Sequence, residues 1–231
     1  MRQLPLAVQL RASSVFASFF RGPNQDVVEQ LMSLVHGPQL PAVWLCGPLA
    51  VGKTHLLQAL CAQAGQQNLS AAYFPLSDST LAPEMLIGCE SLSAVCLDDF
   101  DRVAGRTDWE RAVFRLYTEL EDAPGRLVIA AAAPPASINV ELKDLASRLA
   151  VSTLLRIKPL NDEQQCAALT LRAEQLGLEL SEDVAHWLQR RLPRDMSSLC
   201  DALDTLDRAS LVTQRRLTVS FVRTVMENRT L

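Results

Sequence analysis

The segment 47–54 of this sequence has the residue types and the spacing of a phosphate-binding loop. It fits the pattern G-x-x-x-x-G-K-[ST] at every constrained position, and its residues are Gly47, Pro48, Leu49, Ala50, Val51, Gly52, Lys53 and Thr54. In such a loop the glycines let backbone N–H groups surround a phosphate, the lysine reaches the β- and γ-phosphate oxygens, and the hydroxyl ligates Mg²⁺. A chance glycine turn would have to reproduce all of these residues, so we expect a nucleotide to bind here.

An acidic pair downstream, Asp98 and Asp99, directly follows the apolar run 94–97. When a hydrophobic strand ends on two carboxylates beside a phosphate loop, the first can assist Mg²⁺ and the second can lie near the attacking water. We assign these roles to Asp98 and Asp99 in that order. Many strands end in acidic residues that only cap a turn, so the assignment depends on the phosphate loop upstream.

The elements that must position these residues are short apolar segments that alternate with amphipathic ones. The segment 42–46 before the loop is expected to be a strand, and 55–60 after it begins a helix. Further strands are expected at 71–75, 94–97, 126–130 and 153–157, with a helix over 108–121. Such alternation predicts an α/β fold with a parallel sheet flanked by helices, which binds ligands at the carboxyl ends of its strands.

After Lys158 the sequence predicts only helices. They are expected over 162–176, 181–192, 195–206 and 218–227, separated by Gly177, Pro193 and polar turns. We therefore expect a nucleotide-binding domain over residues 13–160 and a small all-α lid domain over 161–231, preceded by an extended segment over 1–12.

Composition excludes several classes of protein. The chain has 231 residues, of which 48% are hydrophobic, which is enough for one sizeable domain and a smaller one. A formal net charge of −4 argues against a broad basic surface that coats DNA. No stretch is long and apolar enough to span a bilayer, so we expect a cytoplasmic protein without membrane contact. Six scattered cysteines lack the Cys-x-x-Cys spacing of a metal or redox site.

Five segments, spread over nearly the whole chain, resemble one known family. They are 16–19, the phosphate loop, 95–99, 144–149 and 206–210. Together they resemble the AAA+ family and, within it, the DnaA/Hda group. The resemblance implies an AAA+ fold with a helical lid, and binding of ADP (or ATP) with Mg²⁺. It also implies that Phe16 lines the adenine pocket, although an aromatic residue before a first helix is at least as often ordinary core.

The segment 144–149 contains Arg148 and resembles the arginine-finger segment of this family. The resemblance implies that Arg148 enters the nucleotide site of a neighbouring subunit, where arginine fingers in general contribute a factor of about 10³ to 10⁵ in rate. The alternative is a cation that stabilises the carboxyl end of a helix by about 0.3–1 kcal/mol. The residues alone leave both interpretations open.

The first residues also resemble a motif of this group. Gln3, Leu4 and Leu6 resemble the short peptide that docks in a hydrophobic pocket of the sliding clamp, the β subunit of DNA polymerase III. Ala7 and Val8 follow where the family pattern usually has proline or an aromatic residue and then leucine. This departure predicts weaker clamp binding.

Two further departures concern contacts to the γ-phosphate. The family's polar sensor residue after the fourth strand aligns with Ala132, and its sensor arginine in the lid aligns with Ser197. Alanine cannot supply a hydrogen bond, although Arg194 lies close enough in sequence to replace the missing arginine. We therefore expect the chain to hold ADP stably and to have weak or no ATPase activity of its own.

The resemblance implies a regulator that inhibits replication initiation. With ADP and the DNA-loaded clamp, it would supply Arg148 to the initiator DnaA and stimulate hydrolysis of ATP bound there. Because the sequence ends at Leu231 after the lid, we expect no sequence-specific DNA binding. The alternatives are a helicase loader or other DNA-transaction adaptor and, with less support, a small metabolite kinase. Homo-oligomer formation stays open.

Overall fold

The structure is a computed structural model that describes residues 14–34, 42–213 and 217–228. Its residues group into two compact units. Of the described residues, the first unit contains those up to Phe16, those within Asn24–Leu49 and Lys53–Lys158, and the second contains Ala17–Pro23, Ala50–Gly52 and those from Pro159. The two short segments 17–23 and 50–52 therefore group with the second unit, whereas the sequence predicted them within the domain 13–160.

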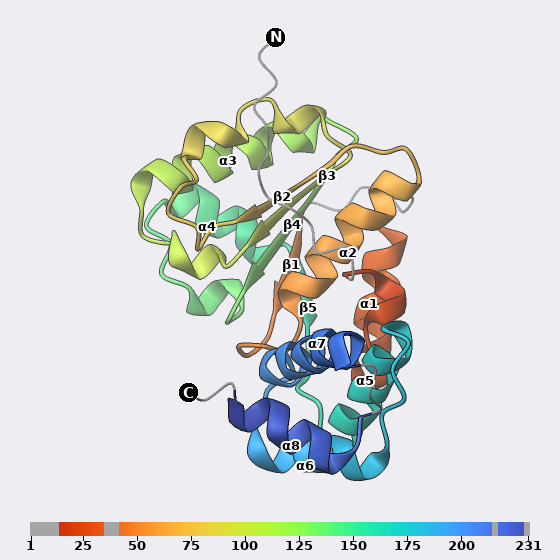
Figure 1. Ribbon diagram of the computed structural model, residues 1–231. Helices are drawn as coiled ribbons and strands as arrows, with labels where there is room; N and C mark the ends of the chain where they lie inside the picture. The colour runs from red at the N-terminus through yellow and green to blue at the C-terminus, as the bar shows by residue number, and fades with distance from the viewer. Residues whose placement is uncertain (1–13, 35–41, 214–216, 229–231) are drawn as a thin grey trace. The chain divides into compact units, whose positions relative to one another are not determined.

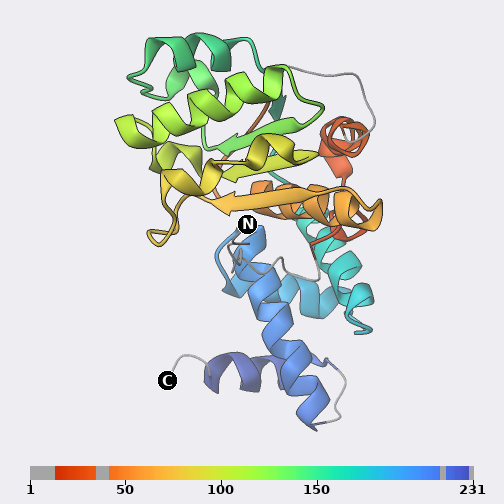
Figure 2. The ribbon, with the colours of Figure 1, turned by 90° about the horizontal axis from the view of Figure 1, so that it is seen from above.

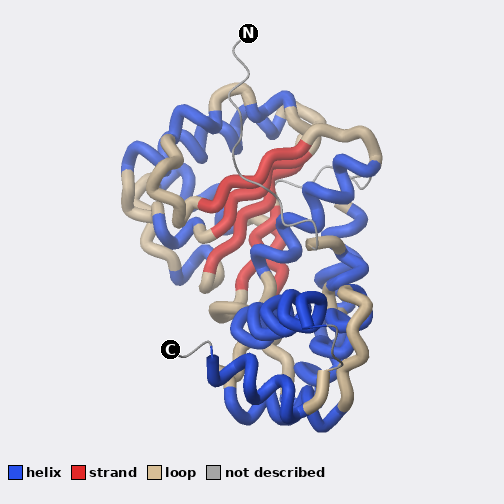
Figure 3. Tube along the Cα trace, viewed as in Figure 1, coloured by secondary structure: helices blue, strands red, loops and turns tan. Residues whose placement is uncertain are grey.

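The first unit contains a five-stranded parallel sheet (Figure 3). Its strands are β1 (Val43–Cys46), β2 (Ala71–Pro75), β3 (Ala94–Asp98), β4 (Arg126–Ala131) and β5 (Thr153–Arg156). In space they follow the order β2-β3-β4-β1-β5. All five strands were predicted from their apolar, β-branched and aromatic residues, and each end agrees to within one residue.

Four helices cover the two faces of this sheet. They are α1 (Gln25–Ser33), α2 (Lys53–Gln66), α3 (Thr107–Glu121) and α4 (Lys143–Ala150). Helices α1 and α2 lie on one face, and α3 and α4 lie on the other (Figures 1 and 2). The core on the α3 side combines Trp109, Val113 and Leu116 of α3 with alternate residues of the strands, such as Trp44 and Ile129. The helical spacing of its apolar residues therefore explains why α3 packs here.

From Pro159 on, the regular elements among the described residues are all helices. They are α5 (Asp162–Gln175), α6 (Glu182–Arg191), α7 (Met196–Thr213) and α8 (Val219–Asn228), packed around a core rich in leucine. A capping box formed by Asn161 and Gln164 begins α5. Helix α7 extends seven residues beyond the predicted end at Leu206, because the chain meets no glycine or proline there.

The side chain of Asn24 fixes the last residue of the first unit. Its Nδ2 donates to the carbonyl oxygen of Lys158 at 2.9 Å, and its Oδ1 accepts from the backbone N–H of Lys158 at 2.7 Å. Asn24 is only 2% exposed, so these bonds satisfy a buried amide. They hold the backbone directly before the helical unit begins at Pro159. None of the helices that the structure describes is long and apolar enough to cross a membrane.

Candidate functional site

The phosphate loop lies at the carboxyl edge of the sheet, between the end of β1 and the start of α2. Strand β1 is flanked by β4 and β5, and Cys46 at its end pairs with Ala131 at the end of β4. Because all strands are parallel, Asp98 at the end of β3 and Ala132 after β4 lie at this same edge. The fold therefore brings together the two segments that the sequence proposed as the nucleotide site.

Lys53 is the buried cation of the loop. It is 7% exposed, and its Nζ donates to the carbonyl oxygens of Gly47 at 2.8 Å and Pro48 at 2.9 Å. Both acceptors are neutral, so these bonds do not balance the charge of the ammonium group. A buried charge needs an opposite charge, which a phosphate oxygen can supply. The lysine therefore fits the role of a phosphate ligand.

Gly52 is required by the shape of the loop. Its φ of +101° is a conformation that residues with a Cβ rarely adopt, and a Cβ there would lie 2.6 Å from Cε2 of Phe19. Ala50 also has a positive φ, of 59°. The ring of Phe19 therefore lies close to the backbone of the loop at Gly52.

Phe16 is buried, at 6% exposure, in the short turn Phe16–Ser18. A ring nitrogen of His55, in the first turn of α2, lies 3.0 Å from the carbonyl oxygen of the preceding Val15. Val15 therefore contacts the helix that follows the loop. The adenine-pocket role of Phe16 stays a prediction.

Asp98 accepts a set of hydrogen bonds that also involves Thr54. Its Oδ2 accepts from the hydroxyl groups of Thr54 at 2.6 Å and Tyr73 at 2.8 Å, and its Oδ1 accepts from the N–H of Asp99 at 3.0 Å. Burial raises the pKa of Asp98, although the bonds from Thr54 and Tyr73 oppose the shift. Burial and the nearby Asp98 carboxylate likewise raise the pKa of Tyr73. Because the buried Asp98 carboxylate is poorly solvated, a cation bound beside it would stabilise its negative charge.

The donor set fits Mg²⁺ bound together with a nucleotide. Within the described ranges, no group of three or more His, Cys, Asp or Glu residues could hold a metal ion by itself. Mg²⁺ commonly takes only one or two carboxylates and completes its coordination with water and phosphate oxygens. The Thr54 hydroxyl and the Asp98 carboxylate lie in contact and can supply the protein's share. When bound, the ion neutralises charge on the phosphate oxygens.

Asp99 adopts a left-handed backbone conformation, with φ 56° and ψ 42°. Its Oδ2 accepts from the Ser77 hydroxyl at 2.9 Å, so its side chain is directed to the segment after β2. A carboxylate that the sequence analysis missed, Asp101, accepts from the N–H of Ala132 at 3.1 Å. The role of Asp99 toward water and the alignment of Ala132 with the family's sensor residue stay predictions.

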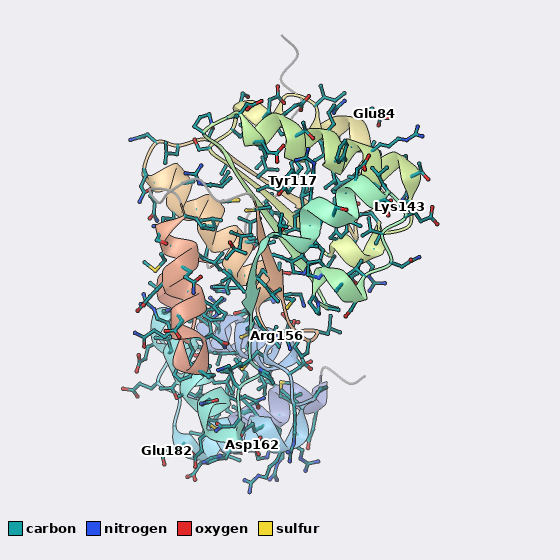
Figure 4. The ribbon with its side chains drawn as sticks, turned by 180° about the vertical axis from the view of Figure 1, so that it is seen from behind. Glu84, Tyr117, Lys143, Arg156, Asp162 and Glu182 are labelled. Atoms are coloured by element: carbon teal, nitrogen blue, oxygen red, sulfur yellow. The ribbon has the colours of Figure 1, made fainter. Side chains whose placement is uncertain are left out.

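Arg148 lies in the last turn of α4 and contacts three residues of α3. Its Nη1 forms an ion pair with Oε1 of Glu121, and its Cζ lies 5.4 Å from the ring centroids of both Phe114 and Tyr117. The Tyr117 hydroxyl also donates to the carbonyl oxygen of Arg148 at 3.4 Å. Figure 4 shows Tyr117 well apart from Arg156, which ends β5 at the edge of the phosphate loop. Arg148 therefore lies toward the other edge of the sheet.

Glu110, on α3, is a buried residue that the sequence analysis missed. It is 1% exposed and accepts the backbone N–H groups of Gly105 at 2.7 Å, Glu141 at 3.1 Å and Leu142 at 2.8 Å. The last two residues directly precede α4, which begins at Lys143 (Figure 4). Its burial could have been inferred from the sequence, because Glu110 lies three residues before Val113 and so falls on the apolar face of the predicted helix.

The structure does not test the roles that were predicted for the remaining residues, which are those of the lid sensor and the clamp-binding segment. Ser197 is an exposed residue in the first turn of α7, and Arg194 lies before this helix with its Nη1 3.7 Å from Oδ2 of Asp162. The clamp-binding residues Gln3, Leu4 and Leu6 lie outside the described residues. Their roles stay predictions.

Comparisons with solved structures identify the fold. Domain III of the replication initiation protein DnaA from Thermotoga maritima superposes with a TM-score of 0.79 at 20% identity, over 96% of this chain and 98% of that one. AMPPCP-bound DnaA from Aquifex aeolicus gives a TM-score of 0.69 at 18% identity, over 85% of this chain and 66% of that longer chain. RuvB from Thermotoga maritima gives a TM-score of 0.65 at 14% identity, over 92% of this chain and 72% of that chain.

The parallel sheet, the phosphate loop and the helical unit give this chain the fold of DnaA domain III and of RuvB. Residues 162–226, in the helical unit, match the family model described as Hda, lid domain. The fold match to DnaA domain III over 96% of the chain and the family-model match over 162–226 confirm the resemblance that the sequence indicated.

Proposed function

We propose that this chain is a regulatory AAA+ protein that stimulates hydrolysis of ATP bound to DnaA and so restrains replication initiation. It acts with ADP in its own phosphate loop and with the DNA-loaded sliding clamp as its platform. The lid match and the DnaA-like fold support a DnaA-related protein. The proposal assigns the catalytic event to the partner's nucleotide site, where Arg148 acts in trans.

The observation that carries this proposal is the distance between Arg148 and the chain's own phosphate loop. Helix α4 ends where β5 begins, whereas the loop follows the carboxyl end of β1, which pairs in parallel with β5. A strand of four residues separates these two edges by about 13 Å, at about 3.3 Å per residue. An arginine on the far edge is suited to the nucleotide of another subunit.

The residues of the loop support a role as a nucleotide holder. Lys53 and the contact between Thr54 and Asp98 can bind a diphosphate with Mg²⁺. Ala132 offers no side-chain hydrogen bond where the family places a γ-phosphate sensor, so retention of ADP is favoured over turnover. DnaA structures with a similar fold were solved with AMPPCP, an ATP analogue, which supports a nucleotide in this fold.

The experiment follows phosphate release from ATP-bound DnaA in the presence of DNA-loaded clamp and ADP. We expect the wild-type chain to accelerate release and the Arg148→Ala variant to lose the acceleration while still binding ADP and clamp. Arg156→Ala is the matched control, because Arg156 is an arginine on the neighbouring strand that lies at the other edge of the sheet. We expect Gln3→Ala to reduce stimulation only when the clamp is present.

Several outcomes decide between the alternatives. Unchanged phosphate release with the wild-type chain refutes the proposed function. Normal stimulation by Arg148→Ala refutes the finger and leaves the fold assignment intact. Direct capture of helicase or single-stranded DNA by the wild-type chain, without any effect on DnaA, favours the loader or adaptor instead.

A further inference from the structure

The Arg148 guanidinium is held against one face of α3. Its three side-chain partners there are Phe114, Tyr117 and Glu121, which follow one another at intervals of three and four residues. Residues at this spacing lie on the same side of a helix. The two rings contact the guanidinium at equal centroid distances of 5.4 Å, and the carboxylate pairs with its Nη1. Arg148 is therefore partly covered and electrically neutralised by its own chain.

We propose that Glu121 retains Arg148 in this withdrawn position, so that a phosphoryl group of the partner must displace the Glu121 carboxylate before the finger can act. The inference rests on the proposed function of Arg148. Glu121 is thus a regulatory residue that acts through the arginine and has no contact with nucleotide of its own. The rings of Phe114 and Tyr117 support the guanidinium in the withdrawn position.

Electrostatics indicate that Glu121 holds Arg148 back and does not present it to the nucleotide of the partner. A guanidinium stabilises a transferring phosphoryl group through its positive charge, and a carboxylate in contact with it cancels most of that charge at a distance. The same carboxylate would repel an incoming phosphate. Arg148 must therefore leave Glu121, or lose most of its effect on the partner.

The contact is weak enough to be reversible. The side chains of Arg148 and Glu121 are 33% and 40% exposed, so water screens the pair. Ion pairs with such exposure favour the paired state by a factor of about 2 to 5. The apparent affinity for a partner falls by the fraction of molecules whose finger is withdrawn. A factor of about 2 to 5 leaves about one third to one sixth of the molecules competent, so we expect Glu121→Gln to lower the half-saturating concentration of this chain about 3- to 6-fold, with the maximal rate unchanged.

The first test uses the isolated chain and needs no partner. Phenylglyoxal modifies accessible guanidinium groups, and peptide mass spectrometry reports the rate at each arginine. We expect Glu121→Gln to raise the rate at Arg148 about 3- to 6-fold and to leave Arg115 unchanged. Glu119→Gln is the matched control, since Glu119 lies on the same helix and pairs with Arg115 at 3.7 Å. It should change Arg115 and leave Arg148 unchanged. An unaltered rate at Arg148 in Glu121→Gln overturns the inference.

The second test repeats the DnaA assay with the same two variants. A lower half-saturating concentration for Glu121→Gln, with Glu119→Gln equal to wild type, supports retention. A higher half-saturating concentration or a lower maximal rate overturns it, because Glu121 would then position the finger for delivery. If Arg148 becomes more reactive but no chain stimulates DnaA, retention stands as a property of the molecule and the proposed function fails.

Discussion

Glu110 provides the sharpest test of how the fold holds α4, because one buried carboxylate accepts three backbone N–H groups before that helix. Gln has nearly the same size and shape as Glu, so Glu110→Gln changes the hydrogen bonds without opening a cavity. One carboxylate oxygen accepts from Gly105 and Glu141, and the other accepts from Leu142. The amide group of Gln has only one acceptor oxygen, and its NH₂ group must face at least one backbone donor.

The expected cost follows from this mismatch. At best the amide oxygen keeps the two bonds to Gly105 and Glu141, which then change from charged to neutral acceptance. The N–H of Leu142 loses its acceptor at a site where Glu110 is 1% exposed. A buried donor without an acceptor costs about 1–3 kcal/mol, and the weakened bonds add to this. We expect Glu110→Gln to lower the free energy of unfolding of the first unit by about 2–4 kcal/mol.

The assay is urea unfolding followed by tryptophan fluorescence. Trp44 and Trp109 lie in the first unit and are buried, whereas Trp187 lies in the helical unit. A Trp187→Phe background therefore restricts the signal to the unit that contains Glu110. We expect the midpoint to fall while the slope with urea stays constant, since the surface exposed on unfolding does not change.

Glu119→Gln on the same helix is the control, because the Glu119 side chain is 38% exposed and pairs only loosely with Arg115 at 3.7 Å. It should change the free energy of unfolding by less than about 0.5 kcal/mol. A loss below about 0.5 kcal/mol for Glu110→Gln as well would refute the reasoning, since it would mean that the carboxylate does not carry these bonds.

The phosphate loop and its metal site give two further predictions. Gly52→Ala should weaken ADP binding and cost about 1–3 kcal/mol in urea unfolding, because its Cβ would lie 2.6 Å from Phe19 at a φ of +101°; Gly65→Ala, in α2 with nothing within 4 Å, should be neutral or stabilising, and equal effects of the two would contradict this reading. Burial raises the pKa of Asp98 above 3.8, so without ligand its contribution to stability is present below pH 3.8 and is lost as the pH rises. In urea unfolding, the stability of the Asp98→Asn variant relative to wild type should therefore increase as the pH rises above 3.8. A difference in stability that does not change with pH would contradict this direction. Removal of Mg²⁺ should reduce ADP affinity of the wild type more than that of Asp98→Asn, as calorimetry can measure.

The nucleotide edge was predictable because local patterns define it. The loop pattern fixes Lys53 and Thr54, and the alternation of strands and helices implies parallel strands, which place Asp98 at the same edge. Tyr73 was not predicted as a partner of Asp98, because a tyrosine within an apolar strand is expected to be an ordinary core residue. Its hydroxyl contact depends on the pairing of β2 with β3, which the sequence does not state.

The surroundings of Arg148 were beyond sequence reasoning for a different reason. The sequence offered a finger or a helix-terminal cation, and both descriptions concern α4 alone. The contacts with Phe114 and Glu121 arise from the packing of α4 against α3, two helices that are separated by β4 and a connecting segment. Side-chain contacts between distant elements depend on their exact orientation, and periodicity gives only the face that is buried.

Helix α3 holds α4 at both of its ends. Glu110 binds the backbone that precedes α4, and Tyr117 donates to the Arg148 carbonyl in its last turn. The position of the Arg148 backbone is therefore set by α3, while Glu121 controls only the direction of its side chain. The hydrogen bonds described above for Lys53, Thr54 and Asp98 involve none of these α3 residues. A nucleotide in the loop can thus affect Arg148 only by shifting packed elements, whereas a partner that offers a phosphoryl group competes with Glu121 directly.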